Sequence, residues 1–334
     1  MRSKKGFEFS FSWIFAIIVG AMIISLAVFA AVRAVNVGKT ATETSLAKQF
    51  TVILEPFETK LASSKNPAPL ELNDEVIFFN KCINDSGFGS QKIKVSLKSG
   101  FYKGQEGEGY EVTALNKYIF SDANETGKKF YYFTKSFNMP FKVANLIFMT
   151  TKKYCFVGLE EGAIKDEVEN VKREYLRYDS TGKCKDDEIK VSFPLYSGTD
   201  WDIKVDPNSD ELSGIVTKKI KEGGVLKDVK LAYSDNLVFA AIFSSPSIYE
   251  CNVNRLFNRM KEQTLIYIKE SDYLNGNNKC NVLSESNLID FYNSIGTYQN
   301  SDANNMNLVL QKALKLDDDN IYASCPLWPR WRNT

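Results

Sequence analysis

Histidine is absent from all 334 residues of the sequence. Because histidine is the commonest general base in enzymes, its absence excludes Ser-His-Asp and Cys-His catalysis and removes the usual zinc ligand sets. The sequence also lacks a CxxC pair, a P-loop and a GxGxxG fingerprint, which are common signatures of metal, nucleotide and dinucleotide sites. We therefore predict no catalytic residue, no cofactor and no metal site, and we do not expect an enzyme.

A large charge of either sign is missing as well. The chain has 42 lysine and arginine residues against 41 aspartate and glutamate residues, which leaves a net charge of +1. It has no basic stripe interleaved with aromatic residues, so the electrostatic footprint of a nucleic-acid-binding protein is absent. We expect no nucleic acid among the partners of this protein.

Cysteine does not occur before residue 82. The six cysteines that follow are Cys82, Cys155, Cys184, Cys251, Cys280 and Cys325. An even number of cysteines suits disulfide bonds, which persist in an oxidising compartment outside the cytoplasm. We predict that Cys155 joins Cys184 and that Cys325 joins Cys251 or Cys280, because these segments flank single helical excursions.

One long apolar run is present, from Phe11 to Val32, directly after the basic residues Arg2, Lys4 and Lys5. About twenty apolar residues, at roughly 1.5 Å rise each, cover the roughly 30 Å hydrocarbon core of a bilayer. The run therefore predicts a transmembrane helix over residues 11–35, preceded by a basic cytoplasmic start over residues 1–10.

A cleaved secretory signal is the alternative to a permanent anchor. Such signals have apolar cores of about 7 to 15 residues, which is shorter than this run, although a cut after Ala30 or Ala31 would fit a loose cleavage pattern. The basic residues before the run narrowly outweigh Arg33 and Lys39 after it, which favours a cytoplasmic N-terminus. We expect a single-pass protein of the cell membrane with an extracellular C-terminal ectodomain.

Two glycosylation signatures lie on the same side of the apolar run as the cysteines. They are Asn84-Asp-Ser86 and Asn124-Glu-Thr126, and they have a meaning only if that side is exported. Asn84 and Asn124 are therefore candidates for glycosylation.

The rest of the chain divides into three regions by its apolar periodicity. Residues 36–64 have helical spacing and predict an amphipathic stalk, with Glu43 and Lys48 facing away from the apolar stripe and a kink at Pro56. Residues 70–245 predict a β-rich α+β ectodomain, and residues 246–334 a helical, disulfide-linked C-terminal region. The fold class expected is α+β.

Within these regions, individual elements are predicted from alternation and spacing. The expected strands cover residues 76–79, 93–97, 130–133, 145–148, 189–193, 203–205, 229–233 and 237–243. The expected helices cover residues 161–178, a long segment that begins at Pro246, and residues 287–295 and 304–314.

Two short patterns resemble functional motifs but lack their remaining parts. The segment from Asp206 to Glu211 has the alternating oxygen ligands of a calcium loop, yet it lacks the glycine and the closing glutamate. Ser180 and Lys183 have the spacing of Ser-Lys acyl enzymes but stand in a loop-forming sequence. We interpret the first as a turn and the second as a chance spacing.

Ala16 and Gly20 stand four residues apart in the apolar run. This small-xxx-small spacing lets helix backbones approach closely in a membrane. It makes the two residues candidates for helix association, through which the chain would form a homo-oligomer.

The start Lys4-Lys5-Gly6-Phe7-Glu8, followed by an apolar helix that continues as an amphipathic one, resembles the N-terminus of type IV pilin-like proteins over residues 1–60. The resemblance implies a processing site between Gly6 and Phe7 and an apolar helix packed in a filament core. The glutamate usual at the fifth mature position of that family is replaced here by Phe11.

We therefore expect a membrane-anchored, disulfide-stabilised surface protein with a structural or interaction role. Its expected partners are the membrane, further copies of the chain in an oligomer or filament held by the N-terminal helix, and an unknown surface protein or glycan. A pilin-like filament subunit or minor component is one alternative. An exported, glycosidase-type enzyme is another, because that chemistry needs two carboxylates and no histidine.

Overall fold

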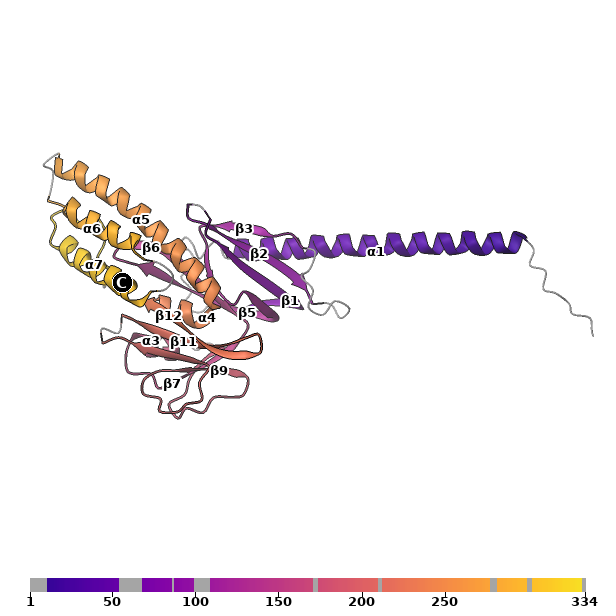
Figure 1. The fold of residues 1–334 in the computed structure, drawn as a ribbon, viewed down its shortest axis with the longest axis horizontal. Coiled ribbons are helices and arrows are strands. Elements are labelled where there is room, and N and C mark those ends of the chain that lie inside the picture. The colour runs from indigo at the N-terminus through magenta and orange to yellow at the C-terminus, as the bar shows by residue number, and fades with distance from the viewer. Residues whose placement is uncertain are drawn as a thin grey trace, which may run out of the picture.

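The computed structural model describes residues 11–53, 68–85, 87–98, 109–170, 174–209, 212–276, 281–298 and 302–331. It has an α+β fold in which one long N-terminal helix precedes two six-stranded sheets and a helical C-terminal region (Figure 1). The expected fold class is thus confirmed. Residues 68–331 are called the globular part below.

Helix α1, Phe11–Ile53, is a single uninterrupted helix of 43 residues. Its N-terminal half extends away from the globular part, and its C-terminal end lies beside strands β2 and β3 (Figure 1). Among the described residues, α1 is the one helix long and apolar enough to cross a membrane. The kink expected at Pro56 lies outside the described residues.

The first sheet packs against α1 and has the strand order β3-β2-β1-β5-β6-β4. All neighbouring strands are antiparallel except β4 and β6, which are parallel. Its strands are β1 Leu70–Ile83, β2 Ser90–Leu97, β3 Val112–Leu115, β4 Tyr118–Phe120, β5 Asn124–Asn138 and β6 Lys142–Thr150.

The second sheet has the order β12-β11-β10-β9-β7-β8. Strands β8, β7, β9 and β10 run parallel, whereas β10, β11 and β12 are antiparallel. Its strands are β7 Lys153–Val157, β8 Leu176–Tyr178, β9 Glu188–Ser192, β10 Ile203–Pro207, β11 Ser213–Glu222 and β12 Val225–Ser234. Gly223 and Gly224, both with positive φ, close the β11–β12 hairpin, because a two-residue turn of this kind requires φ above zero.

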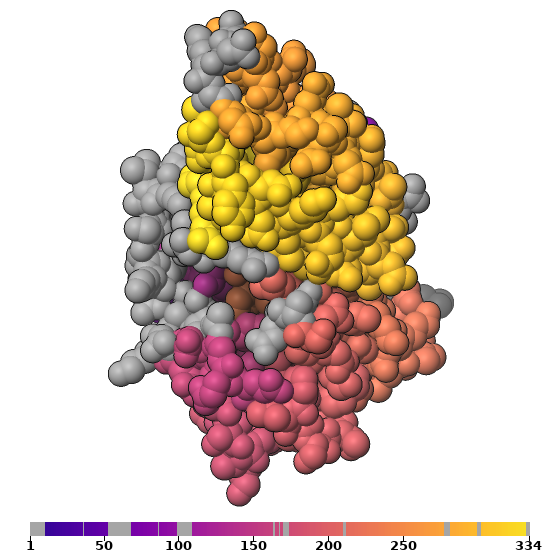
Figure 2. Space-filling model, turned by 90° about the vertical axis from the view of Figure 1, so that its left-hand side faces the viewer, coloured from indigo at the N-terminus to yellow at the C-terminus, as the bar shows by residue number. Residues whose placement is uncertain are grey.

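The C-terminal region is helical, as expected. Helices α5 Pro246–Gly276, α6 Glu285–Gly296 and α7 Ala303–Ile321 lie side by side (Figure 1). On the face opposite α1, the segment that contains α7 lies directly above the strands of the second sheet (Figure 2). The main hydrophobic core fills the space between these helices and both sheets.

Two predicted elements are wrong. Residues 237–243 form a helix, α4 Leu237–Phe243, instead of a strand, and all seven of its residues are buried. A short apolar run that is buried on every side has no periodicity to distinguish helix from strand. The helix expected over residues 161–178 is shorter, α3 Ala163–Asn170, and strand β8 follows it at residues 176–178.

Candidate functional site

The N-terminal half of α1 exposes apolar side chains around its whole circumference. Exposed large side chains on this half include Phe11, Trp13, Phe15, Ile18, Met22, Ile23, Leu26, Phe29 and Val32. A helix that is apolar on every side requires an apolar environment, which is either a protein core or a membrane. The globular part supplies no such cover, since none of the most apolar stretch is buried.

The two helix-association candidates lie within this exposed half. Ala16 is exposed, and a side chain added at Gly20 would meet no atom within 4 Å. The backbone at Gly20 is thus open to close approach by another helix. Their role in association stays a prediction. Gly6 and Phe7, the predicted processing site, lie outside the described residues.

The C-terminal half of α1 is joined to the first sheet by the buried carboxylate of Glu43. Glu43 Oε1 accepts hydrogen bonds from the backbone N–H of Leu97 at 2.9 Å and from Ser96 Oγ at 3.3 Å. Its Oε2 accepts one from the backbone N–H of Gly109 at 3.0 Å, and Lys39 Nζ lies 3.7 Å from Oε1. The expectation that Glu43 faces away from the packed side is therefore wrong.

Aromatic packing continues this junction along the same face of α1. Ala47 and Phe50, one and two turns after Glu43, are buried. The ring of Phe50 lies 5.0 Å from that of Phe78 on β1 and 5.2 Å from that of Phe130 on β5. The last turns of α1 thus belong to the hydrophobic core of the first sheet, and the exposed apolar half continues from them without a break.

Two disulfide bonds connect distant segments of the globular part. Cys82 on β1 is bonded to Cys251 on α5. Cys155 on β7 is bonded to Cys184, and this bond is the one predicted from the sequence. Because Cys251 is bonded to Cys82, the predicted bond from Cys325 to Cys251 is wrong. Cys325 is also disulfide-bonded, and its remaining predicted partner, Cys280, lies outside the described residues.

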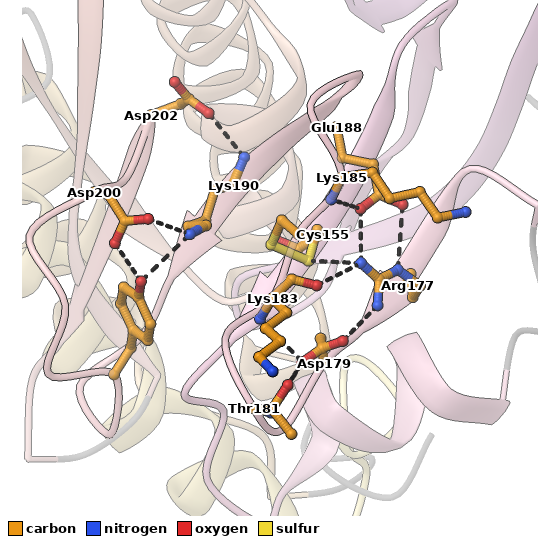
Figure 3. The surroundings of a disulfide bond; sticks show 12 residues. Cys155, Arg177, Asp179, Thr181, Lys183, Lys185, Glu188, Lys190, Asp200 and Asp202 are labelled. Carbon is orange, nitrogen blue, oxygen red and sulfur yellow. Dashed lines mark hydrogen bonds and ion pairs between the residues drawn. A yellow bond between two sulfur atoms is a disulfide. The ribbon is translucent and has the colours of Figure 1, made fainter.

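Arg177 organises the surroundings of the Cys155–Cys184 bond (Figure 3). Its guanidinium donates to both carboxylate oxygens of Glu188, at 3.2 and 2.8 Å, and to Lys183 O at 2.9 Å. The hydrogen bond to Glu188, followed by the one to Asp179, raises the pKa of Arg177. The pKa of the Asp179 carboxyl is lowered by hydrogen bonds from Thr181 and from Arg177.

The same loop contains the residues of the apparent Ser-Lys motif. Ser180 and Lys183 are both exposed, whereas that chemistry needs a buried, deprotonated lysine. Cys155, Cys184 and Glu188 have ligand atoms within 4.8 Å of one another. The two sulfur atoms form a disulfide bond, and Glu188 forms an ion pair with Arg177. These interactions already engage all three residues, so we interpret the group as structural.

The segment that resembles a calcium loop follows β10. Asp206 pairs with Lys204 at 2.7 Å, and Asn208 Nδ2 donates to Ser213 Oγ at 2.8 Å. The first acidic position of the loop is thus engaged by a lysine. Residues 210 and 211 lie outside the described residues.

Both glycosylation candidates are exposed in the structure. Asn84 directly follows β1, in the turn that leads to β2. Asn124 is the first residue of β5 and is paired with Phe79 of β1 in the sheet. Asn84 thus lies in a turn, whereas Asn124 lies in a strand.

Arg255 on α5 is a buried cation that the sequence does not predict. Its Nη1 donates to Gln91 Oε1 at 3.1 Å, Lys117 O at 3.1 Å and Asn252 Oδ1 at 2.8 Å. The guanidinium also lies 4.6 Å from the centre of the Tyr118 ring. Burial lowers the pKa of Arg255 to about 10. The available sequence signal was an arginine between the apolar positions of a helix, and it does not identify partners from other elements.

Two further buried ionisable groups lie where the sheets meet. Lys218 Nζ donates to the backbone oxygens of Ile242 at 2.9 Å and Ser244 at 2.6 Å, at the end of α4, and burial lowers its pKa to about 8. Burial raises the pKa of Glu125, although Oε2 accepts a hydrogen bond from Thr151 Oγ1 at 2.6 Å.

Glu125 lines a pocket of about 630 Å³ together with Asp187, Lys152 and Lys153. Asp187 pairs with Lys153 at 2.9 Å, so the lining of the pocket contains both carboxylates and lysines.

A scan against models of protein families, a search of curated proteins and a search of solved structures each found no match for this chain. A carboxylate-dependent activity therefore stays a prediction.

Proposed function

We propose that this chain is a single-pass membrane protein whose helix α1 holds a disulfide-bonded ectodomain at the cell surface, where it has a structural or interaction role. The observation that carries the proposal is the continuity of α1. One half of this helix is apolar and uncovered, and the other half is built into the first sheet through Glu43 and Phe50.

The dimensions of α1 fit a bilayer. The segment from Phe11 to Val32 is about 33 Å long at 1.5 Å per residue, and a hydrocarbon core is about 30 Å thick. Glu43 then lies about 16 Å beyond the end of the apolar segment. A span of this length supports a position of the first sheet just outside the headgroup region.

The junction makes the ectodomain a rigid extension of the anchor. A flexible linker would let an ectodomain move freely above the membrane, whereas here the same helix is both anchor and part of the core. The globular part is therefore held at a fixed height and tilt. This arrangement suits a protein that presents a surface to other molecules.

The disulfide bonds support an exported globular part. Cytoplasmic thiols are kept reduced, and structural disulfides persist outside. The described residues include no free cysteine. A globular part with these bonds fits an orientation with the N-terminus in the cytoplasm.

Surface labelling of intact cells tests this proposal. A membrane-impermeant amine reagent should modify lysines of the globular part without permeabilisation, and the protein should stay in the membrane pellet after a carbonate wash. Reduction should add about 6 Da, two hydrogens for each of three disulfides. Labelling that needs permeabilised cells, or cysteines that react before reduction, would contradict the proposal.

A matched pair of variants tests the anchor separately. Met22→Arg places a charge near the centre of the apolar segment, which costs about 3 kcal/mol of membrane insertion and should release a fraction of the protein from the pellet. Ile289→Arg, on the exposed side of α6, should leave the pellet fraction unchanged. Equal retention of both variants would argue against a spanning helix.

A pilin-like filament subunit or minor component is the second candidate. It is favoured by the same division of α1 into an uncovered apolar half, which would pack in a filament, and a half packed on a sheet. N-terminal sequencing of the protein from its native membrane tests this reading. A mature start at Phe7 would support it, and an uncut Met1 would support a permanent anchor. A start near Val32 would identify a secreted protein and overturn both candidates.

A further inference from the structure

Asn84 borders a polar pocket between the β1–β2 turn and the C-terminal helices. The pocket has a volume of about 290 Å³, and its lining includes Asn84, Asn254, Asn258 and Lys261, together with Tyr298 after α6. Sites for small ligands have volumes of about 300 to 1,000 Å³. The pocket lies just below this range, which suits a ligand as small as one sugar ring.

The amide of Asn84 is oriented by α5. Asn258 Nδ2 donates to Asn84 Oδ1 at 3.4 Å, and the described residues provide no acceptor for Asn84 Nδ2. Two residues earlier, the bond between Cys82 and Cys251 fixes the end of β1 to α5, with 6.0 Å between the Cα atoms. The structure therefore holds the oxygen of this amide and leaves its nitrogen accessible.

The lining of the pocket suits a neutral polyol. Asn254, Asn258 and Lys261 are spaced i, i+4 and i+7 on α5, which places them on one face of the helix. Side-chain amides both donate and accept hydrogen bonds, and an ammonium donates them, so together they match sugar hydroxyls. The described lining contains no carboxylate, which disfavours a metal ion, and its single lysine is a weak site for a multiply charged anion.

We propose that Asn84 carries an N-linked saccharide whose first sugar lies in this pocket against α5. The proposal rests on the proposed function, because the modification requires that the globular part is exported. The sequence supplies the required Asn-x-Ser signature at residues 84–86. The saccharide attached to Asn84 then occupies the pocket next to this residue.

The modification needs a saccharide donor, which we take to be a sugar linked to a lipid diphosphate and used by a membrane transferase. Asn84 Nδ2 forms a bond to the anomeric carbon of the sugar and loses one proton. The bond between that carbon and the phosphate oxygen breaks, and the lipid diphosphate leaves with its electron pair. No oxidant or reductant takes part.

Asn124 is the natural comparison within the chain. It has the same signature, but its backbone is fixed in the sheet opposite Phe79, and the adjoining pocket contains Lys152, Lys153 and Asp187 instead of amide side chains. We expect that Asn84 is modified and that Asn124 is not.

Peptide mass spectrometry of the full chain from its native membrane tests the modification. The peptide with Asn84 should carry added mass that yields sugar fragment ions, and the peptide with Asn124 should not. Asn84→Gln and Ser86→Ala should each abolish the added mass, whereas Asn124→Gln should leave it unchanged. An unmodified Asn84 in a protein whose globular part is labelled on intact cells would overturn the inference and leave the proposed function standing. A globular part labelled only after permeabilisation would overturn both.

Periodate oxidation tests the seating of the sugar, because periodate cleaves the bond between two adjacent carbons that carry free hydroxyls, and it does so faster where the sugar is exposed. In the double variant Asn254→Ala with Lys261→Ala, which keeps the contact between Asn258 and Asn84, oxidation should be at least about threefold faster, since hydrogen bonds to the sugar are lost. Glu262→Ala, an exposed position on the same helix, should not change the rate. Equal rates in all three proteins would show that the saccharide projects into solvent and would overturn the pocket assignment.

Discussion

Glu43 of α1 accepts a hydrogen bond from the backbone amide of Leu97 on β2, at 2.9 Å. The two residues are far apart in sequence, and their contact makes the N-terminal helix part of the first sheet. Ser96 Oγ and the amide of Gly109 complete the set of donors around this buried carboxylate. A buried charge is tolerated when hydrogen bonds replace its lost hydration.

The first prediction concerns the stability of this junction. Glu43→Ala should lower the free energy of unfolding by about 2 to 4 kcal/mol, because it leaves buried backbone donors without an acceptor. Glu43→Gln keeps one carbonyl oxygen and should lose less. Denaturant unfolding of the full chain in detergent, followed by tryptophan fluorescence, measures the difference. Thr42→Ala, on the exposed side of α1, is the control, and equal stability of the Glu43→Ala and Thr42→Ala proteins would contradict the junction.

The second prediction concerns the aromatic contacts two turns further on. Phe50→Ala removes a ring that packs against Phe78 and Phe130, and truncation of a buried phenylalanine costs about 3 to 5 kcal/mol. Val52→Ala, at a position where the side chain is 59% exposed, should cost less than about 0.5 kcal/mol. Limited proteolysis should also cut the Phe50→Ala protein faster near the end of α1. A Phe50→Ala protein as resistant as the Val52→Ala control would show that α1 does not need this contact.

The regular features of the chain are predictable from its sequence, whereas features that depend on distant residues are not. The apolar run of α1 predicts its helix by length. The alternation of strand β2 and the helical spacing after Pro246 are periodicities that report on burial. Residues 237–243 have none, because every residue of α4 is buried. The end of that helix is capped by Lys218 from a neighbouring strand, which no local pattern reveals.

Glu43 shows the same limit at the candidate site. Charge alone places a glutamate on the outer side of an amphipathic helix, which predicts an apolar packed stripe that excludes Glu43. In the structure, the packed face contains Glu43, Ala47 and Phe50, and backbone amides of the sheet and the following segment make the charge acceptable there. A buried charge can be recognised only when its partners are known, and these partners come from residues 96 to 109.

The third prediction compares the two disulfide bonds. In the chain-entropy description, a bond stabilises by restricting the unfolded chain, and the effect grows with the length of the closed loop. The Cys82–Cys251 bond spans 169 residues and the Cys155–Cys184 bond 29. Replacing the first pair by serine should therefore cost about 1.5 kcal/mol more than replacing the second. Thermal unfolding of both double variants measures this difference, and a larger loss for the Cys155–Cys184 pair would show that native contacts around Arg177 outweigh chain entropy.

The fourth prediction follows from the burial of Lys218, which lowers its pKa in the folded protein to about 8 from an ordinary value of 10.5. Between these two values the unfolded chain binds the proton and the folded chain does not, so the folded state is favoured as the pH rises. Lys218 should therefore add on the order of 2 kcal/mol to the free energy of unfolding between pH 8 and pH 10.

Denaturant titrations at several pH values, with Lys218→Met and Lys221→Met side by side, isolate this contribution. Lys221 is exposed on the same strand, so its replacement should preserve the rise in stability, whereas Lys218→Met should abolish it. The Lys218→Met protein should also be less stable than its parent at pH 10, where the parent no longer has to bury a charge, because the backbone oxygens of Ile242 and Ser244 lose their donor. Parallel pH profiles of Lys218→Met and its parent would contradict the prediction. They would show that Lys218 has the same charge in the folded and the unfolded chain between pH 8 and pH 10.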